Sequence, residues 1–247
     1  MKLIISTKTG NYYYFDETKN QDFHTKEGFV KLDDILNNKK VISNTNKEFL
    51  VLEASDFDKI NKFKRGPQLI QAKDLGYVVG RCRLSRKSCV LEAGGGMGVA
   101  TSFFSSIVDS VTTYEIREEH LKIIRSNLDF MNCDNVELKL GDLNDEIGSY
   151  EKEKFDLLFL DMPDVEKVLE KDLKSIKNGG YIVCYVPSIT QVLDITKVIE
   201  EKHDELYLEE TTEIISRQWK CWGKVARPNH RKENDHTAFL VFIRKIW

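Results

Sequence analysis

The segment Val-Leu-Glu-Ala-Gly-Gly-Gly-Met-Gly at residues 90–98 decides how this chain folds. An apolar run that ends in a carboxylate precedes the glycines, and a segment with helical spacing follows them. Glycines at such a point allow a tight turn from a strand into a helix, and they let the main chain approach a ligand closely. The segment therefore predicts a ligand-binding turn, although glycine turns of this kind serve many nucleotides.

Strands and helices alternate on the carboxyl side of this turn. The apolar patterning predicts strands at 88–92, 110–115, 136–140, 155–160 and 181–186, and helices at 99–108, 118–131, 166–176 and 190–202. Such alternation is typical of a parallel sheet with helices on both faces. The tail differs, with a strand-like stretch at 205–219, a polar loop at 223–236 and a last strand at 237–244. Two strands without a crossover helix should pair antiparallel.

The order of elements therefore predicts an α/β fold, a doubly wound, Rossmann-like sheet whose last strand is antiparallel. That arrangement is typical of methyltransferases that use S-adenosylmethionine (SAM), whereas plain dinucleotide-binding folds normally lack the reversed strand. The first residues differ from the rest, with short β-rich runs at 2–6, 12–15, 41–43 and 49–52. We expect a small β-rich N-terminal domain over 1–57, a linker and helix over 58–87, and a SAM-dependent methyltransferase domain over 88–247.

The composition sets limits on partners and location. The net charge of −3 over 247 residues excludes whole-molecule attraction to nucleic acid, so any contact with RNA must come from local basic patches. No apolar stretch approaches a membrane span and no signal peptide is visible, which predicts a cytoplasmic protein with no membrane contact. The five cysteines are scattered and never spaced as C-x-x-C, so neither a disulfide framework nor a metal site is expected.

Acidic residues at the ends of three consecutive predicted strands indicate the cofactor. Glu115 ends the second strand, where a carboxylate can accept hydrogen bonds from both ribose hydroxyls of an adenosine. Asp142 follows the third strand and suits the exocyclic amine of the adenine. Glu92, just before the glycines, would repel a pyrophosphate but suits a cationic aminoacyl group. Because ligands of open α/β sheets bind at this edge, the pattern favours SAM over a dinucleotide.

Asp161 is the predicted catalytic residue. It opens the segment Asp-Met-Pro-Asp at 161–164, directly after the very apolar strand at 155–160. This position brings a carboxylate to the mouth of the sheet, beside the expected methyl group. Asp164, three residues further on, is expected to cap the helix that follows.

The chain resembles the tRNA adenine-N1 methyltransferases that act on the T-loop, especially the homotetrameric archaeal and bacterial type. The resemblance extends over nearly the whole chain, and its later signatures are more specific than the glycine turn. The segments that carry it are DFHTKEG (22–28), RGPQLIQAKD (65–74), the glycine turn, YEIR (114–117), DMPD (161–164), YVPSITQV (185–192) and HTAFL (236–240).

The resemblance implies both the site and the reaction. Asp161 would accept a hydrogen bond from the exocyclic amine of the target adenine, orient the base and stabilise the positive charge that develops on it. The partner would be tRNA, methylated at N1 of position 58 and, in the archaeal manner, of position 57, and the assembly a homotetramer. The residues that would line the SAM site are Gly94, Gly96, Met97, Gly98, Glu115, His120, Asp142 and Asp161.

The sequence departs from the family pattern at three positions. Gly95 and Met97 stand where the family usually has small hydroxyl residues, so side-chain hydrogen bonds to SAM are lost there. Gln71 replaces a usual tyrosine, which removes an aromatic ring that could stack on the target base.

Basic residues in three segments are the candidate RNA contacts, because cations meet phosphates and aromatic rings stack on bases. They are Lys62, Lys64 and Arg65; Arg81, Arg83, Arg86 and Lys87; and Arg217, Lys220, Lys224, Arg227, Arg231 and Lys232, interleaved with Trp219 and Trp222. Two alternatives stay open: a SAM-dependent methyltransferase for another substrate, and a non-catalytic tRNA-binding subunit. The second is disfavoured because Glu115, Asp142 and Asp161 are all present.

Overall fold

The computed structural model of the chain describes residues 1–64, 66, 69–202, 204–229 and 236–246. It divides into two compact units, Met1–Lys64 and Arg65–Trp247. The finer division into 1–57, 58–87 and 88–247 stays a prediction. Its middle segment contributes to both units, since α2 (Asp56–Ile60) falls in the first and α3 (Ala72–Cys82) in the second.

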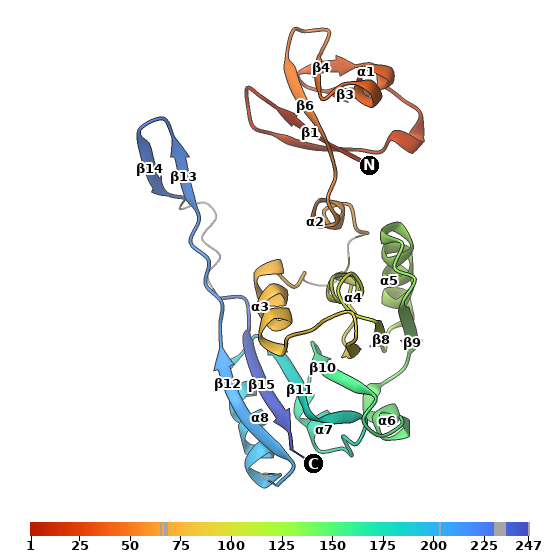
Figure 1. The fold of residues 1–247 in the computed structure, drawn as a ribbon, viewed down its shortest axis with the longest axis vertical. Helices are drawn as coiled ribbons and strands as arrows, with labels where there is room; N and C mark the ends of the chain where they lie inside the picture. The colour runs from red at the N-terminus through yellow and green to blue at the C-terminus, as the bar shows by residue number, and fades with distance from the viewer. Residues whose placement is uncertain (65, 67–68, 203, 230–235, 247) are drawn as a thin grey trace. The chain divides into compact units, whose positions relative to one another are not determined.

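The first unit is a small β-rich fold around its own core (Figure 1). Its antiparallel sheet has the order β2-β1-β6-β5, and its core is made mainly of Ile4, Phe15, Phe23, Ile35 and Phe49. The strands are β1 (Lys2–Ser6), β2 (Tyr12–Phe15), β5 (Lys40–Ile42) and β6 (Glu48–Glu53), joined by the hairpin of β3 (Phe23–Thr25) with β4 (Gly28–Val30) and by helix α1 (Leu32–Asn37). The sequence patterns did not predict this hairpin or α1.

The segment DFHTKEG (22–28), which resembles the family, spans β3 and the turn of this unpredicted hairpin. The carboxylate of Glu27 accepts hydrogen bonds from the hydroxyls of Ser6, Thr9 and Tyr13 at 2.9, 3.2 and 3.1 Å. Gly28 has a φ of +101°, and a Cβ there would lie 2.5 Å from Oδ1 of Asn44. The segment therefore ties together the hairpin tips of this unit, which is a structural role.

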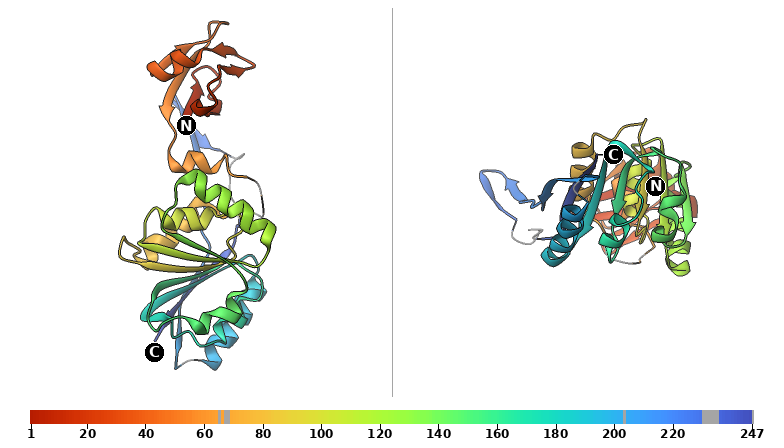
Figure 2. Two further views of the ribbon diagram at one scale, coloured as in Figure 1. Left: turned by 90° about the vertical axis from the view of Figure 1, so that its right-hand side faces the viewer. Right: turned by 90° about the horizontal axis from the view of Figure 1, so that it is seen from below.

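The second unit is a seven-stranded sheet in the order β12-β15-β11-β10-β7-β8-β9, covered by helices on both faces (Figure 2). Helices α3, α4 and α5 lie on one face, and α6, α7 and α8 lie on the other. The strands are β7 (Cys89–Ala93), β8 (Ser110–Glu115), β9 (Val136–Leu140), β10 (Phe155–Leu160), β11 (Ile176–Val186), β12 (Leu206–Thr212) and β15 (Phe239–Lys245). The helices after α3 are α4 (Val99–Ser105), α5 (Glu118–Met131), α6 (Leu143–Glu146), α7 (Val165–Leu169) and α8 (Ile189–Glu201).

The predicted fold class is confirmed. Strands β7 to β11 pair parallel, while β15 lies between β11 and β12 and runs antiparallel to both. The β11–β15 register pairs Tyr185 with Leu240 and Val186 with Phe239. The last strand therefore returns into the sheet rather than extending its edge.

Several predicted elements are wrong in extent, among them the strand expected at 181–186, which begins at Ile176, and the helix expected at 99–108, which ends at Ser105. The helix expected at 166–176 ends at Leu169, because the chain enters β11 at Ile176. The strand expected at 205–219 ends at Thr212. The loop expected at 223–236 contains a strand, β14 (Val225–Pro228), which forms a hairpin with β13 (Trp219–Trp222) just before the loop. Gly223 has a φ of +53° there, the backbone conformation that a two-residue hairpin turn requires.

Candidate active site

The glycine turn and the end of β10 are in direct contact. The backbone N–H of Asp161 donates to the carbonyl oxygen of Ala93 at 2.9 Å. Gly94 has a φ of +90°, and a Cβ there would lie 1.8 Å from the carbonyl oxygen of Asp161. Gly96 and Gly98 also have positive φ, and Gly98 is the residue from which α4 begins. The turn thus requires glycine at 94, because any side chain would overlap the main chain at Asp161.

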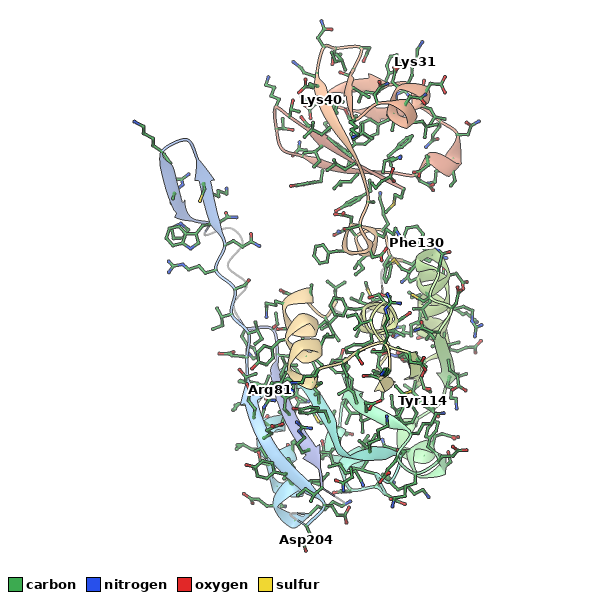
Figure 3. The ribbon with its side chains drawn as sticks, viewed as in Figure 1. Lys31, Lys40, Arg81, Tyr114, Phe130 and Asp204 are labelled. Atoms are coloured by element: carbon green, nitrogen blue, oxygen red, sulfur yellow. The ribbon has the colours of Figure 1, made fainter. Side chains whose placement is uncertain are left out.

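A cavity of about 440 Å³ opens at the carboxyl ends of β7, β8, β9 and β10. Residues directly after each of these strands form its wall, as expected for a ligand site of a parallel sheet. The ring of Tyr114, labelled in Figure 3, belongs to this wall. The polar and glycine residues that line it include Gly94, Gly96, Glu115, Arg117, Asp142, Asn144, Asp161 and Lys167.

The carboxylate of Glu115 is held by two backbone donors. It is buried, and its Oε2 accepts from the N–H of Gly96 at 3.2 Å. Its Oε1 accepts from the N–H of Arg117 at 3.0 Å, and the Nε of Arg117 lies 3.6 Å from the same oxygen. A carboxylate fixed in this way at the rim of the cavity can accept hydroxyl donors of a ligand without rearranging.

Asp142 has both a structural role and a place in the cavity wall. Its Oδ1 accepts from the backbone N–H of Asn144 at 2.9 Å and from the amide Nδ2 of Asn144 at 3.0 Å, which caps the short helix α6. The expected acceptor is therefore present where β9 ends, oriented by its own helix cap.

Glu92 and Asp161 line a second, smaller cavity beside the glycine turn. Burial raises the pKa of both carboxyl groups to about 7, and the neighbouring Asp161 further raises the pKa of Glu92. Thr101 donates its hydroxyl to Oε2 of Glu92 at 2.6 Å, while Oε1 has no hydrogen-bond partner among the described residues. An unpartnered buried oxygen is costly, and a cationic ligand group would satisfy it.

These two cavities fit a ligand with a nucleoside part and a cationic amino-acid part. Glu115 and Asp142 offer acceptors in the larger cavity, and Glu92 with Asp161 offers acidic groups in the smaller one. No cluster of three or more His, Cys, Asp or Glu side chains in the described part of the chain is arranged to hold a metal ion.

Three of the residues predicted to bind the cofactor do not line the larger cavity. Met97 lines the smaller cavity, and its Sδ accepts the backbone N–H of Gly66 at 3.3 Å. Gly98 and His120 line neither cavity. His120 lies behind Glu115, with Nδ1 3.8 Å from Oε2 of that residue. Roles for these residues stay predictions.

The prediction that the side chain of Asp164 caps the following helix is wrong. Asp164 does precede α7, but it has a φ of 56° and makes no capping hydrogen bond. Its carboxylate pairs instead with Lys167 at 2.7 Å. Both residues line the larger cavity, as does Arg117, and the sequence patterns assigned none of them to it. Only their closeness in sequence to Asp161 and Glu115 could have indicated this.

The topology separates several candidate RNA contacts from the cavity. Arg83, Arg86 and Lys87 precede β7, so they lie at the edge of the sheet opposite to the cavity. Arg81, labelled in Figure 3, forms ion pairs with Glu209 at 3.1 Å and Glu210 at 2.9 Å. These pairs neutralise Arg81, which argues against its predicted contact with RNA.

The hairpin of β13 and β14 keeps the features expected of an RNA contact. Trp219 is 56% exposed, and the guanidinium of Arg217 lies 5.8 Å from its ring centre. Lys220, Lys224 and Arg227 are exposed on the same hairpin. Arg65, Arg231 and Lys232 lie outside the described residues, as does the side chain of Trp222.

The strand order, the reversed β15 and the cavity at the carboxyl ends of the strands define the class of SAM-dependent methyltransferases. Within that class, the family model described as tRNA methyltransferase complex GCD14 subunit matches residues 59–238. The chain belongs to this family. No helix in the described part is long and apolar enough to cross a membrane.

Two curated relatives cover most of this chain. One is the tRNA (adenine(58)-N(1))-methyltransferase TrmI of Thermus thermophilus, 30% identical over 98% of this chain and 96% of its own length. The other is the tRNA (adenine(57)-N(1)/adenine(58)-N(1))-methyltransferase TrmI of Methanocaldococcus jannaschii, 29% identical over 91% of this chain and 88% of its own. Among solved structures, tRNA (m1A58) methyltransferase TrmI from Aquifex aeolicus superimposes with a TM-score of 0.85, at 27% identity over 100% of this chain and 96% of its own.

Proposed function

We propose that this protein transfers a methyl group from SAM to N1 of adenine 58 in the T-loop of tRNA, with adenine 57 as a second target in the archaeal manner. The observation that carries the proposal is the partly buried carboxyl group of Asp161, a residue that lines both cavities. Relatives that cover nearly the whole chain are named for this reaction, which supports the assignment of the substrate.

Four acidic residues and the glycine turn would bind the cofactor. Glu115 would accept the ribose hydroxyls, and Asp142 would accept from the adenine amine. Glu92 and Asp161 would face the cationic amino-acid part, because both carboxyl groups lie in the smaller cavity. Gly94, Gly96, Met97 and Gly98 would form the turn against which the cofactor lies, and His120 would support Glu115 from behind. SAM supplies an electrophilic methyl group to this site.

Asp161 would act on the base. Its ionised carboxylate would accept a hydrogen bond from the exocyclic amine of adenine and hold N1 in line with the methyl group. Methylation at N1 leaves the ring positively charged, so the same carboxylate would stabilise charge that develops in the transition state. Burial keeps its pKa near 7 in the free protein, and a cation bound next to it would favour the ionised form.

The target atom lies on the Watson–Crick edge, so the adenine must leave its stack to reach the cavity. Trp219 and the lysines of the β13–β14 hairpin would hold the surrounding RNA by stacking and phosphate contacts. We further propose a cytoplasmic homo-oligomer, a homotetramer as the family resemblance implies. Light scattering in solution tests it, because a mass of one 28.6 kDa chain would contradict assembly.

The test is incubation with methyl-labelled SAM and an unmodified tRNA transcript, followed by nucleoside mass spectrometry. We expect label in N1-methyladenosine, and its loss when adenines 57 and 58 of the transcript are both replaced by uridine. Label in another nucleoside would show a methyltransferase with a different substrate. Binding of tRNA without binding of SAM would show a non-catalytic subunit.

A further inference from the structure

A buried charged pair lies where α3 begins, outside both cavities. The ammonium group of Lys73 donates to Oδ1 of Asp74 at 2.7 Å, to the hydroxyl of Thr237 at 2.7 Å and to the carbonyl oxygen of Ile214 at 2.6 Å. The side chain of Asp74 is 1% exposed and that of Lys73 is 12% exposed. All three ammonium protons therefore have an acceptor, and the two charges neutralise each other.

The second oxygen of Asp74 faces two hydroxyl groups. Thr237 donates to Oδ2 of Asp74 at 2.9 Å, and the hydroxyl of Tyr185 lies 3.5 Å from the same oxygen. Burial raises the pKa of Tyr185, and the Asp74 carboxylate raises it further, so this phenol stays protonated and is a donor. The network thus ends on the hydroxyl of Tyr185.

Tyr185 lies on the strand next to Asp161. The β10–β11 register pairs Leu160 with Cys184, so Asp161, directly after β10, and Tyr185, the next residue of β11, follow the same pair. The ring of Tyr185 packs at 6.5 Å from the ring of Phe159, on the same face of the sheet. The far end of the network therefore adjoins the candidate catalytic residue.

Stability alone does not account for a buried lysine and aspartate at this place. Removing two charges from water is costly, and apolar residues of similar volume often stabilise a fold at least as well as a buried ion pair. The pair instead orients two hydroxyl groups, because those of Thr237 and Tyr185 both donate to the same carboxylate oxygen of Asp74.

We propose that Lys73, Asp74 and Thr237 are positioning residues for methyl transfer: they hold the hydroxyl of Tyr185, and hence its ring, in place beside Asp161. This inference rests on the proposed function. The network also contacts both ends of the chain segment that carries the β13–β14 hairpin, through Ile214 before it and Thr237 after it. The hydroxyl of Tyr185 and the two ends of the segment that carries the hairpin are therefore held by the same charged pair.

The test is a double-mutant cycle in the full-length protein, read as single-turnover methylation of a tRNA transcript. Thr237→Val keeps the volume and leaves Lys73 paired with Asp74, while Tyr185→Phe removes only the hydroxyl at the other end. We expect each to slow methyl transfer about 10-fold, the effect of removing one hydrogen bond, with the dissociation constant of SAM changed less than about 2-fold. Thr237→Ser, which keeps the hydroxyl, should restore the rate.

The decisive result is the double variant. If Thr237 acts through Tyr185, adding Thr237→Val to Tyr185→Phe should cost less than about 2-fold more. Losses that multiply, or a Tyr185→Phe variant with the wild-type rate, would overturn the inference. Tyr185→Phe gives this answer even if Thr237→Val fails to fold. Failure of the proposed function is distinguishable, because the wild-type protein would then form no N1-methyladenosine.

Discussion

Glu92 and Asp161 lie close together, and each should prefer a different protonation state in the free protein and in the protein with bound cofactor. Without a ligand, burial raises the pKa of both carboxyl groups to about 7, so the folded protein favours their neutral forms. A bound cation favours the ionised forms. Ionising these carboxyl groups is therefore unfavourable in the free protein and becomes favourable when a cationic ligand binds. As pH rises, the free protein should lose stability while its affinity for SAM increases.

Glu92→Gln tests this at the level of one residue. The folded pKa of Glu92 lies above its unfolded value of about 4.3, so its contribution to stability is present at low pH and is lost as pH rises through 7. Because glutamine does not titrate, the melting temperature of the free variant should fall less than that of the wild type between pH 5 and 8. SAM should bind the variant more weakly at pH 8, as measured by calorimetry.

Exposed Glu119→Gln is the matched control for the loss of one negative charge. It should reproduce neither effect. Parallel pH profiles for wild type and Glu92→Gln would contradict the assigned electrostatics.

The glycine turn between β7 and α4 contacts the main chain at Asp161, so it links the proposed cofactor site to the proposed catalytic residue. Gly94→Ala should lower the free energy of unfolding by about 2 kcal/mol or more and weaken SAM binding more than about 10-fold, because its Cβ would overlap the carbonyl oxygen of Asp161. Gly76→Ala is the control. It lies exposed inside α3 with no atom near its Cβ, and should stabilise the helix by about 0.5–1 kcal/mol.

Urea unfolding and SAM titration measure both variants. A Gly94→Ala protein with unchanged stability and affinity would show that the turn can move away from β10 without consequence.

The sequence predicted those helices and strands that are marked by patterns within the element and at its two ends. The bounds of β8, α5, β9 and β10 agree with the prediction because apolar periodicity and flanking turn residues mark both ends of each. The carboxyl-end rule for parallel strands likewise anticipated that Glu115, Asp142 and Asp161 lie around one cavity.

Long-range contacts could not be predicted in this way. The network of Lys73, Asp74 and Thr237 joins residues more than 160 positions apart, which no spacing rule reveals. Arg81 of α3 pairs with Glu209 and Glu210 of β12, far away in the sequence. The local sequence does not reveal this contact, so Arg81 was predicted to be free for RNA. The hairpin of β13 and β14 was missed because polar and basic residues obscure its two short strands.

At the scale of the whole molecule, a net charge of −3 requires that tRNA be held by local cations. Replacing Lys220 and Lys224 of the β13–β14 hairpin by alanine should weaken tRNA binding. The slope of log affinity against log salt should become shallower by about 1 for each phosphate that is no longer neutralised. SAM binding should not change, because neither lysine lines either of the two cavities described above.

Alanine at the exposed Lys152 and Lys197 is the control for removing two positive charges. Affinity and salt slope, measured by filter binding, should stay at the wild-type values for this pair. Equal losses for the two double variants would exclude a specific role of the hairpin.

The most direct test of the central role of Asp161 is single-turnover methylation of a tRNA transcript by the wild type and by Asp161→Ala, with SAM binding measured on the same samples. We predict N1-methyladenosine as the wild-type product. We also predict a rate at saturating SAM at least about 100-fold lower for the variant, with SAM affinity reduced by less than about 10-fold, because Asp161 is one of several acidic contacts of the cofactor and its carboxylate acts mainly on charge in the transition state. A variant that binds SAM and still methylates adenine N1 near the wild-type rate would contradict that role.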